Sequence, residues 1–381
     1  MKRLLKQKDQ ISKVVFMCIK PTKPDNYARR VKLHIKALAH TFKAGAHIGF
    51  ENVLAKELSM LGINSCQRQS GAVCFEAKLE QVWQAIVLSR CARSFEMLVS
   101  EFHCENFGKL EQKIKHIPWE LYLPQEGELR INVNCEKSRL YHKGAVSERI
   151  KNNVNFGGKL NVKFKEDVCS IWLDLCGEPL YKRGERWVED APLQESLAAS
   201  ILLYADFAKY EKLIDPMAGS GVFSLEAAKW RSNSVKLERD FDFMKIPAFR
   251  EAAFKNFLQK AKPLFTGKNI ETLCSDKSEK AIKTIKHNAK DYLNDISISR
   301  IDFFSLSPTQ NALLVINPPY GKRMAKEKNL CKEIAKKIER DFSKCGAVVL
   351  CPPWENMGEN YLSLQTYNGG LKIHLKSYNV L

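Results

Sequence analysis

The hydrophobic pattern near the start of the chain predicts a small unit of helices and strands. Apolar residues recur at helical spacing from Phe50 to Leu61, and Gly62 follows where a helix would stop. The run 71–76 has the length of a short strand, and apolar residues from Leu79 to Ile86 return to helical spacing. We therefore expect an α+β unit over residues 44–95, whose function is not visible in its pattern.

The middle of the chain shows strands separated by basic turns. Residues 129–134 alternate apolar and polar side chains, which predicts a half-exposed strand. A turn containing Gly144 leads from this strand into a helix that includes Ser147. Further on, Val168–Leu175 and Leu180–Arg183 flank the sequence Cys-Gly-Glu-Pro, which predicts a hairpin.

From Leu193 onward, helices alternate with short apolar runs, and this alternation predicts a parallel, doubly wound α/β sheet. The five runs are 213–215, 270–274, 296–302, 313–317 and 347–351. The third run is the least regular because polar residues interrupt it. Segments 361–367 and 371–375 flank Asn-Gly-Gly, so a hairpin should add antiparallel strands to one edge of the sheet.

Basic residues outnumber acidic residues. The 381 residues include 61 Lys and Arg against 43 Asp and Glu, a formal charge of +18. Such an excess favours a polyanionic partner such as nucleic acid, although a merely soluble basic protein would also carry it. Two clusters are the predicted phosphate contacts: Lys137, Arg139, His142 and Lys143, then Lys182, Arg183 and Arg186.

The cysteines and the apolar runs indicate the compartment. None of the 12 cysteines has CxxC spacing, and the closest pairs lack a nearby histidine, so we expect reduced thiols in a cytoplasmic protein without a metal site. No apolar run reaches the roughly 18 residues of a membrane helix, so no membrane partner is expected. The chain is long enough for two or three domains.

A glycine-containing turn follows the first predicted strand of the α/β part. The sequence Leu213-Ile-Asp-Pro-Met-Ala-Gly-Ser-Gly221 leads into an apolar helix, which lets a ligand approach the backbone at the sheet's carboxyl edge. Ser224 stands where a dinucleotide fingerprint has its third glycine, so an NAD(P)-dependent oxidoreductase is disfavoured. Asp215 at the strand tip favours a ligand with a positive amino group. A plain strand-to-helix turn is the alternative.

Two further carboxylates follow the next two predicted strands. Asp276 stands where a carboxylate commonly accepts the ribose hydroxyls of a nucleoside, and Asp302 follows the third strand. Either residue could instead cap a helix or a turn. Together with Asp215, they are better explained by one nucleoside pocket.

The sequence Asn317-Pro-Pro-Tyr-Gly321 follows the fourth predicted strand. Two prolines prevent the strand from continuing and leave carbonyl groups without strand partners. The Asn317 side-chain oxygen and the Pro318 carbonyl can accept both hydrogens of an aromatic amine, and Tyr320 can stack on its ring. After a buried strand and a glycine motif, this pattern favours amine chemistry over a merely structural turn.

The motifs together resemble the THUMP-domain guanine-N2 RNA methyltransferases, close to the bacterial 23S rRNA group. The resemblance rests on DPMAGSG, the Asp276 segment, NPPYGKR and GEPLYKRGERW…APLQESLAAS, and it extends from about residue 41 to the end. TFKAGAHIGFENVLAKEL resembles the family's ferredoxin-like opening, and CEKSRLYHKGAVSERI resembles the end of its THUMP module. Residues 1–40 have no counterpart, and Ala218 stands where relatives often carry cysteine.

After a basic N-terminal extension over 1–40, the resemblance implies three domains: a ferredoxin-like domain over 41–95, an RNA-binding THUMP domain over 96–185 and a class I methyltransferase domain over 186–381. It implies S-adenosylmethionine as cofactor, bound by Leu193, Glu195, Asp215, Pro216, Ala218, Gly219, Ser220, Gly221, Asp276, Asp302 and Asn317. The catalytic residues it implies are Asn317, Pro318, Pro319 and Tyr320. The substrate it implies is the N2 atom of a guanosine in structured RNA, most simply 23S rRNA.

Other functions stay open. A tRNA guanine-N2 methyltransferase or an adenine-N6 nucleic-acid methyltransferase would use the same active site, although the THUMP-like region argues against DNA. A non-catalytic RNA-binding factor for ribosome assembly is disfavoured by the intact Asn317 and glycine motifs.

Overall fold

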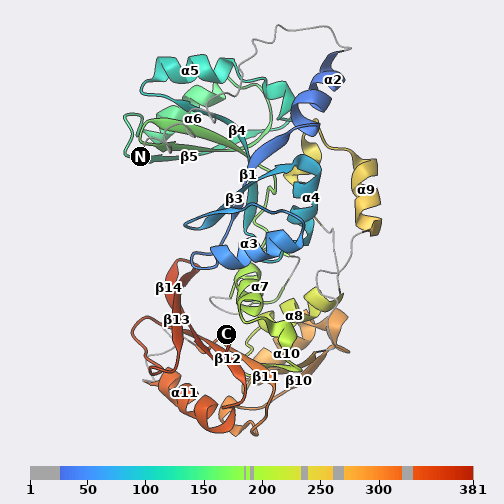
Figure 1. Ribbon diagram of the computed structural model, residues 1–381, viewed down its shortest axis with the longest axis vertical. Helices are drawn as coiled ribbons and strands as arrows, with labels where there is room; N and C mark the ends of the chain where they lie inside the picture. The colour runs from blue at the N-terminus through green and yellow to red at the C-terminus, as the bar shows by residue number, and fades with distance from the viewer. Residues whose placement is uncertain are drawn as a thin grey trace.

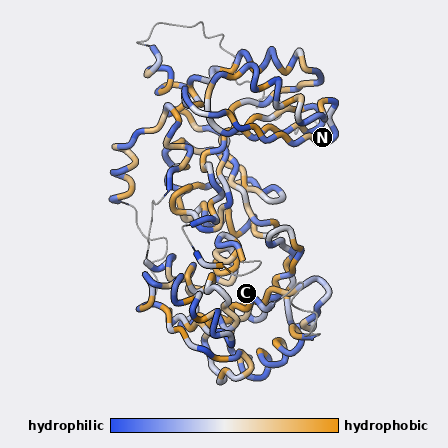
Figure 2. The backbone as a smooth tube through the Cα atoms, turned by 180° about the vertical axis from the view of Figure 1, so that it is seen from behind, coloured by the Kyte–Doolittle hydropathy of each residue, from blue (hydrophilic) through white to orange (hydrophobic). Residues whose placement is uncertain are grey.

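The chain folds into two units, each built on a seven-stranded sheet, and they are stacked along the long axis of the molecule (Figure 1). The computed structural model describes residues 26–183, 186–188, 193–232, 239–260, 270–319 and 329–380. We call 26–183 the N-terminal unit and the described residues from 193 onward the C-terminal unit. Hydrophobic residues recur along the strands and helices of both (Figure 2). No helix in the described ranges is long and apolar enough to cross a bilayer.

The sheet of the N-terminal unit is antiparallel except for one parallel pair, β5 with β6. In spatial order its strands are β2 (Gln67–Gln69), β3 (Ala72–Lys78), β1 (Ala39–Gly45), β4 (Ser94–His103), β7 (Val168–Asp174), β6 (Gly158–Lys165) and β5 (Leu129–Glu136). Its helices are α2 (Tyr27–Val31), α3 (Glu51–Met60), α4 (Leu79–Leu88), α5 (Phe107–Lys115) and α6 (Lys143–Lys151). The predicted boundary between 95 and 96 lies inside β4, which joins both halves of the sheet.

One sequence prediction for this unit needs correction. Val168–Leu175 does not form a hairpin with Leu180–Arg183, because β7 already pairs with β4 on one side and β6 on the other. Beyond β7 the chain leaves the sheet at Gly177, which has a φ of 74°. Within the basic extension 1–40, α2 starts at Tyr27 and Arg30 pairs with Glu120 at 2.7 Å.

The sheet of the C-terminal unit is parallel over five strands, with an antiparallel hairpin at one edge. In spatial order its strands are β10 (Ile296–Ser299), β9 (Glu271–Ser275), β8 (Lys212–Asp215), β11 (Ala312–Ile316), β12 (Gly346–Cys351), β14 (Leu371–Tyr378) and β13 (Leu362–Asn368). Its helices are α7 (Glu195–Tyr204), α8 (Val222–Ser232), α9 (Glu251–Lys260), α10 (Glu279–Asn288) and α11 (Leu330–Asp341). Every residue of β11 and β12 is buried, as expected for parallel strands covered on both faces.

This order confirms the predicted α/β fold with a doubly wound sheet and an edge hairpin. Strand order reverses between β8 and β11, which is the switch point where open α/β sheets bind ligands. The irregular run 296–302 forms a strand only as far as Ser299, because its polar residues face solvent at the end of the edge strand β10.

One segment of the C-terminal part packs on the N-terminal unit. Residues 239–260, between α8 and β9, reach back so that α9 lies beside α4 (Figure 1). The Trp83 ring of α4 stacks on Phe243 at 5.8 Å and meets Phe249 edge-on at 5.2 Å. Arg239 donates hydrogen bonds to the carbonyls of Cys176 and Pro179, both at 3.1 Å. We call residues 239–260 the returning arm.

Candidate active site

Three neighbouring parallel strands, β9, β8 and β11, end at one edge of the sheet. Asp215 is the last residue of β8, Asp276 follows β9 directly, and Asn317 follows β11 directly. The structure therefore brings these three predicted site residues to the same edge, on either side of the switch point.

The loop after β8 has the backbone conformation that its glycines allow. It carries Pro216, Ala218, Gly219, Ser220 and Gly221. Gly219 and Gly221 have φ values of 55° and 77°, in the left-handed region that favours glycine. A side chain built on Gly219 would meet no atom within 4 Å, so the backbone there faces open space. On Gly221 it would come within 3.3 Å of Ile285 on α10. The first glycine leaves room for a ligand, and the second lets α10 pack closely.

Asp215 is buried beneath this loop. One of its carboxylate oxygens accepts hydrogen bonds from the Ser224 hydroxyl at 3.0 Å and from the Ser224 backbone N–H at 3.3 Å. Burial raises the pKa of Asp215 to about 7, and the Ser224 hydrogen bonds oppose the rise. A cation bound nearby would favour the charged form of this carboxylate.

Asp276 fastens the glycine loop to the start of α10. One carboxylate oxygen accepts from the Gly219 N–H at 3.0 Å, and the other accepts from the Ser278 N–H at 2.9 Å. The N-cap of α10 is Ser278, whose hydroxyl accepts from the Ala281 N–H. Asp276 is therefore not the helix cap that the sequence left as an alternative.

Asp302 does cap a turn. Its side chain accepts a hydrogen bond from the Phe304 N–H at 2.8 Å, at the start of the 3-10 helix Phe303–Ser305. The capping alternative is realised for this residue, which leaves a role for it in a nucleoside pocket as a prediction.

Asn317 presents an unused acceptor at the end of β11. Its side-chain oxygen is buried, and no hydrogen-bond partner for it lies within the described residues. A buried amide oxygen without a donor is costly unless a ligand supplies one. Pro318 behind it is buried and Pro319 is exposed, whereas Tyr320 lies outside the described residues.

Known proteins match this chain in both units. Residues 183–368 match the sequence model of the RMKL-like methyltransferase domain, and residues 41–93 match that of the RlmL ferredoxin-like domain. These matches assign residues 183–368 to the RMKL-like methyltransferase domain and residues 41–93 to the RlmL ferredoxin-like domain. The C-terminal unit is accordingly called the methyltransferase domain below.

Relatives extend the likeness over most of the chain. The ribosomal RNA large subunit methyltransferase K/L of Syntrophotalea carbinolica is 28% identical, over 89% of this chain and 53% of that protein. YpsC of Bacillus subtilis is 26% identical, over 89% of this chain and 96% of YpsC. The chain thus spans about half the length of the K/L relatives.

Solved structures share the fold over both units. SMU.472 complexed with SAH has a TM-score of 0.79 at 24% identity, over 90% of this chain and 98% of that chain. A protein from Listeria monocytogenes, described as a predicted N6-adenine-specific DNA methylase, has a TM-score of 0.78 at 24% identity, over 89% of this chain and 96% of that one.

The segment before α7 connects to the domain through Arg186. The Leu193 carbonyl accepts a hydrogen bond from Arg186 at 3.2 Å, and the Glu195 carboxylate lies 3.5 Å from the same guanidinium. Glu195 opens α7, and Leu193 is buried. Both predicted cofactor residues are thus engaged with Arg186.

The two basic clusters differ in exposure. Lys137, Arg139, His142 and Lys143 are all exposed at the turn between β5 and α6. Arg139 forms ion pairs with Glu105 at 3.3 Å and Asp167 at 3.6 Å, yet its side chain stays 67% exposed. This cluster has the accessibility that phosphate contacts require.

The second cluster is mostly internal, which corrects the sequence prediction. Lys182 is exposed, but Arg183 reaches the buried Glu226 at 2.6 Å and also donates to the Arg90 carbonyl. Arg186 is bound to Leu193 and Glu195 as described above. Sequence clustering could not distinguish a surface arginine from one whose acidic partner is 43 residues away.

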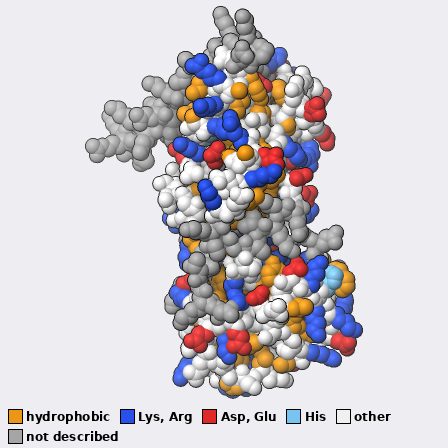
Figure 3. Space-filling view, turned by 90° about the vertical axis from the view of Figure 1, so that its right-hand side faces the viewer, with side chains coloured by type: hydrophobic (Ala, Val, Ile, Leu, Met, Phe, Trp, Pro, Cys, Tyr) orange, Lys and Arg blue, Asp and Glu red, His pale blue; other side chains and the backbone are white. Residues whose placement is uncertain are grey.

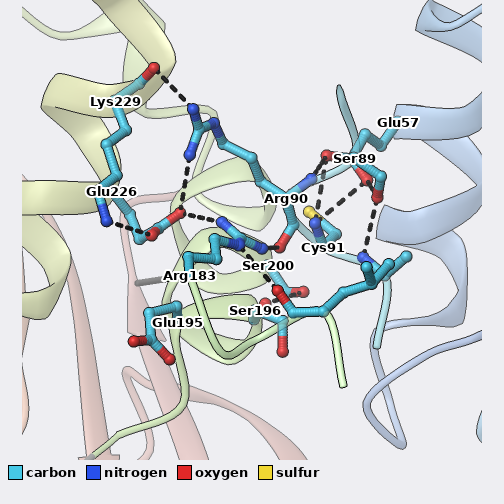
Figure 4. Close-up of polar contacts among 12 residues, drawn as sticks. Glu57, Ser89, Arg90, Cys91, Arg183, Glu195, Ser196, Ser200, Glu226 and Lys229 are labelled. Carbon is cyan, nitrogen blue, oxygen red and sulfur yellow. Dashed lines mark hydrogen bonds and ion pairs between the residues drawn. The ribbon is translucent and has the colours of Figure 1, made fainter. Parts of the chain in front are cut away.

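A buried ion-pair network joins the two units, and sequence reasoning missed it (Figure 4). Glu226 of α8 pairs with Arg183, with Arg90 of the N-terminal unit at 3.6 Å and with Lys229 at 3.8 Å. Burial pushes the pKa of Glu226 up, but Arg183, Lys229 and Arg90 together lower it below its usual value. The available signal was a Glu and a Lys three residues apart among the mostly apolar residues 222–230 of α8.

The same junction continues into the N-terminal unit. Buried Glu57 accepts hydrogen bonds from the Ser89 hydroxyl at 2.5 Å and from the Arg90 N–H at 2.7 Å. His47 of the same unit hydrogen-bonds to Ser196 of α7 at 2.8 Å. Because α7 packs on α8, which directly follows the glycine loop, these contacts join the N-terminal unit to the helices next to that loop.

Proposed function

We propose that this protein is an S-adenosylmethionine-dependent RNA methyltransferase that methylates the exocyclic N2 of a guanosine, in 23S rRNA of a bacterial cytoplasm. The observation that carries the proposal is the buried, unpartnered Asn317 oxygen at the end of β11. An amine hydrogen of the base would satisfy it, and the nitrogen lone pair would then point out of the ring plane.

The residues of the glycine loop fit the cofactor. The open backbone at Gly219 leaves space for a nucleoside, while Asp276 and the buried Asp215 supply negative charge for a cationic ligand. When bound, S-adenosylmethionine supplies an electrophilic methyl group on a sulfonium. The chain's own part is to hold the base amine, exclude water and accept the amine hydrogens at Asn317 and the Pro318 carbonyl.

Two lines support RNA as the substrate. The K/L relatives are named ribosomal RNA large subunit methyltransferases, and the formal charge of +18 suits a polyanion. We propose that residues 96–185 form the RNA-binding THUMP domain ahead of the methyltransferase domain. A tRNA guanosine and an adenine N6 atom are the competing acceptors, since either amine could meet Asn317.

The test is to identify the methylated nucleoside. Purified protein with labelled S-adenosylmethionine should label unmodified 23S rRNA, and nuclease digestion with mass spectrometry should yield N2-methylguanosine. tRNA and duplex DNA serve as parallel substrates. Label on adenine N6 of duplex DNA would overturn the substrate assignment, and label confined to tRNA would replace rRNA by tRNA.

The exposed basic cluster should supply phosphate contacts. Replacing Lys137, Arg139 and Lys143 together by alanine should weaken RNA binding and reduce the slope of log K against log salt by about 2, at ~0.7 per phosphate contact. Cofactor affinity should stay unchanged because the cluster lies in the N-terminal unit. Filter binding across a salt series measures the slope.

A matched control removes the same charge elsewhere. Lys209, Lys255 and Lys336 are exposed lysines of the C-terminal part, each paired with a nearby acid. Their triple alanine variant has the same net charge as the cluster variant and should keep more of the wild-type slope. Equal slopes in both variants would mean that the first cluster acts only through net charge.

A further inference from the structure

Trp187 is exposed, yet its backbone is fixed. The residue is 56% exposed, although both its polar backbone groups are bonded to one side chain of α10. Its N–H donates to the Asn288 side-chain oxygen at 2.9 Å, and its carbonyl accepts from the Asn288 amide at 2.9 Å. The same amide donates to the Ser220 carbonyl at 3.0 Å. Asn288 therefore holds Trp187 beside the glycine loop through contacts that do not involve the indole ring.

The indole ring lies flat against a second ring. Its centroid is 3.6 Å from that of His287, with an angle of 10° between the planes. Stacking covers one face of the indole, so its exposed surface includes the opposite face. A rigid backbone and a ring backed on one side form a platform on which another flat group can stack at little cost in conformational entropy.

Lysines surround this platform. Lys283 lies four residues before His287, a spacing that shares a helix face, and Lys286 precedes His287 directly. Lys290 opens the 3-10 helix Lys290–Tyr292 just beyond the end of α10, and all three lysines are exposed. Lys283 forms an ion pair with Glu279 at 3.0 Å, one turn earlier on α10. Figure 3 shows Lys and Arg side chains gathered around a histidine and a hydrophobic group on the lower unit.

We infer that Trp187, His287 and the exposed lysines Lys283, Lys286 and Lys290 form an RNA-docking surface, on which Trp187 stacks against an unpaired base. This inference rests on the proposed function and assigns a substrate contact within the methyltransferase domain itself. The lysines favour a polyanion over the adenine of the cofactor, because S-adenosylmethionine carries a net positive charge. Proteins usually bind single-stranded RNA without sequence preference by stacking its bases on aromatic side chains, while basic side chains contact its phosphates.

The Trp187→Ala variant tests the platform. A stem-loop RNA with unpaired bases should bind about tenfold more weakly, which corresponds to the loss of one stacking contact. A fully paired RNA of the same composition should bind as before. Trp187→Phe should retain most of the affinity, because a smaller ring still stacks. Cofactor affinity, measured by calorimetry, should be unchanged in both variants because the Asn288 contacts involve only the Trp187 backbone.

Leu362→Ala is the matched control, since Leu362 is 55% exposed at the start of β13, the edge strand of the same domain. It should leave RNA binding unaltered. Unchanged binding of the stem-loop by Trp187→Ala would overturn the inference, and so would a loss of cofactor affinity with RNA binding intact, which would assign the ring to adenine. These measurements of RNA and cofactor binding do not require the protein to catalyse methylation. Failure of the wild type to methylate guanosine would instead count against the proposed function.

Discussion

Replacing Asn317 by alanine is expected to lower turnover about a hundredfold or more, while affinities for RNA and cofactor change by less than about threefold. The reason is that its buried oxygen has no partner among the described residues and would meet the substrate amine. An interaction that aligns the lone pair becomes stronger as the new bond forms. Loss of this interaction should therefore lower kcat more than it weakens binding. Single-turnover methylation and calorimetric binding of each ligand measure the two effects separately.

Substitutions at Tyr320 extend this prediction. Tyr320→Phe should be mild because stacking survives loss of the hydroxyl, whereas Tyr320→Ala should lose the platform for the base and much of the activity. Full activity of Asn317→Ala would show that the amine is not held there, and the proposed mechanism would then be wrong.

The second large effect concerns stability. Glu226→Ala should lower the free energy of unfolding by about 3–5 kcal/mol, because it leaves buried cations without their shared partner. Arg183 lies 2.6 Å from this carboxylate, and Arg90 from the other unit lies 3.6 Å away. Urea denaturation followed by fluorescence measures the change. Glu226→Gln should fall between alanine and wild type, since the amide keeps a hydrogen bond to Arg183 without the charge.

The pH dependence follows from the lowered pKa of Glu226. Its contribution is fully present above the ordinary glutamate pKa of 4.5 and is lost as pH falls through the lower folded pKa. The exposed pair of Glu251 with Lys255 offers the control, because Glu251→Ala should leave the unfolding curve unchanged. Equal stability of Glu226→Ala and wild type would mean that the junction does not depend on this network.

The sequence was sufficient for the parts of the fold that depend on local pattern. Asp215, Asp276 and Asn317 could be placed at one sheet edge because apolar runs end directly before them and glycine or proline follows. Which strands pair with one another in a sheet was harder to predict. The failed hairpin had good turn residues, but β7 finds its neighbours in β4 and β6, which its own sequence does not encode.

Buried charge was also beyond the sequence pattern. Arg183 and Arg186 looked like part of a basic surface because both stand in a run of basic residues. Arg183 is buried against Glu226 of α8 and Arg186 against Glu195, so their burial depends on acids that stand outside the basic run. Tertiary packing determines whether a charged side chain is buried or faces water. The local spacing of residues in the sequence does not indicate which of the two occurs.

The returning arm sets an order of events during synthesis. Trp83 belongs to the unit that leaves the ribosome first, but its aromatic partners Phe243 and Phe249 come from the arm. About 160 residues separate Trp83 from Phe243, and at ~5–20 residues per second they take roughly 8–30 s to translate. Throughout that interval the N-terminal unit has an uncovered aromatic surface on α4. The nascent chain is therefore most exposed to misassociation before the arm emerges, and slower translation between these residues would prolong that period.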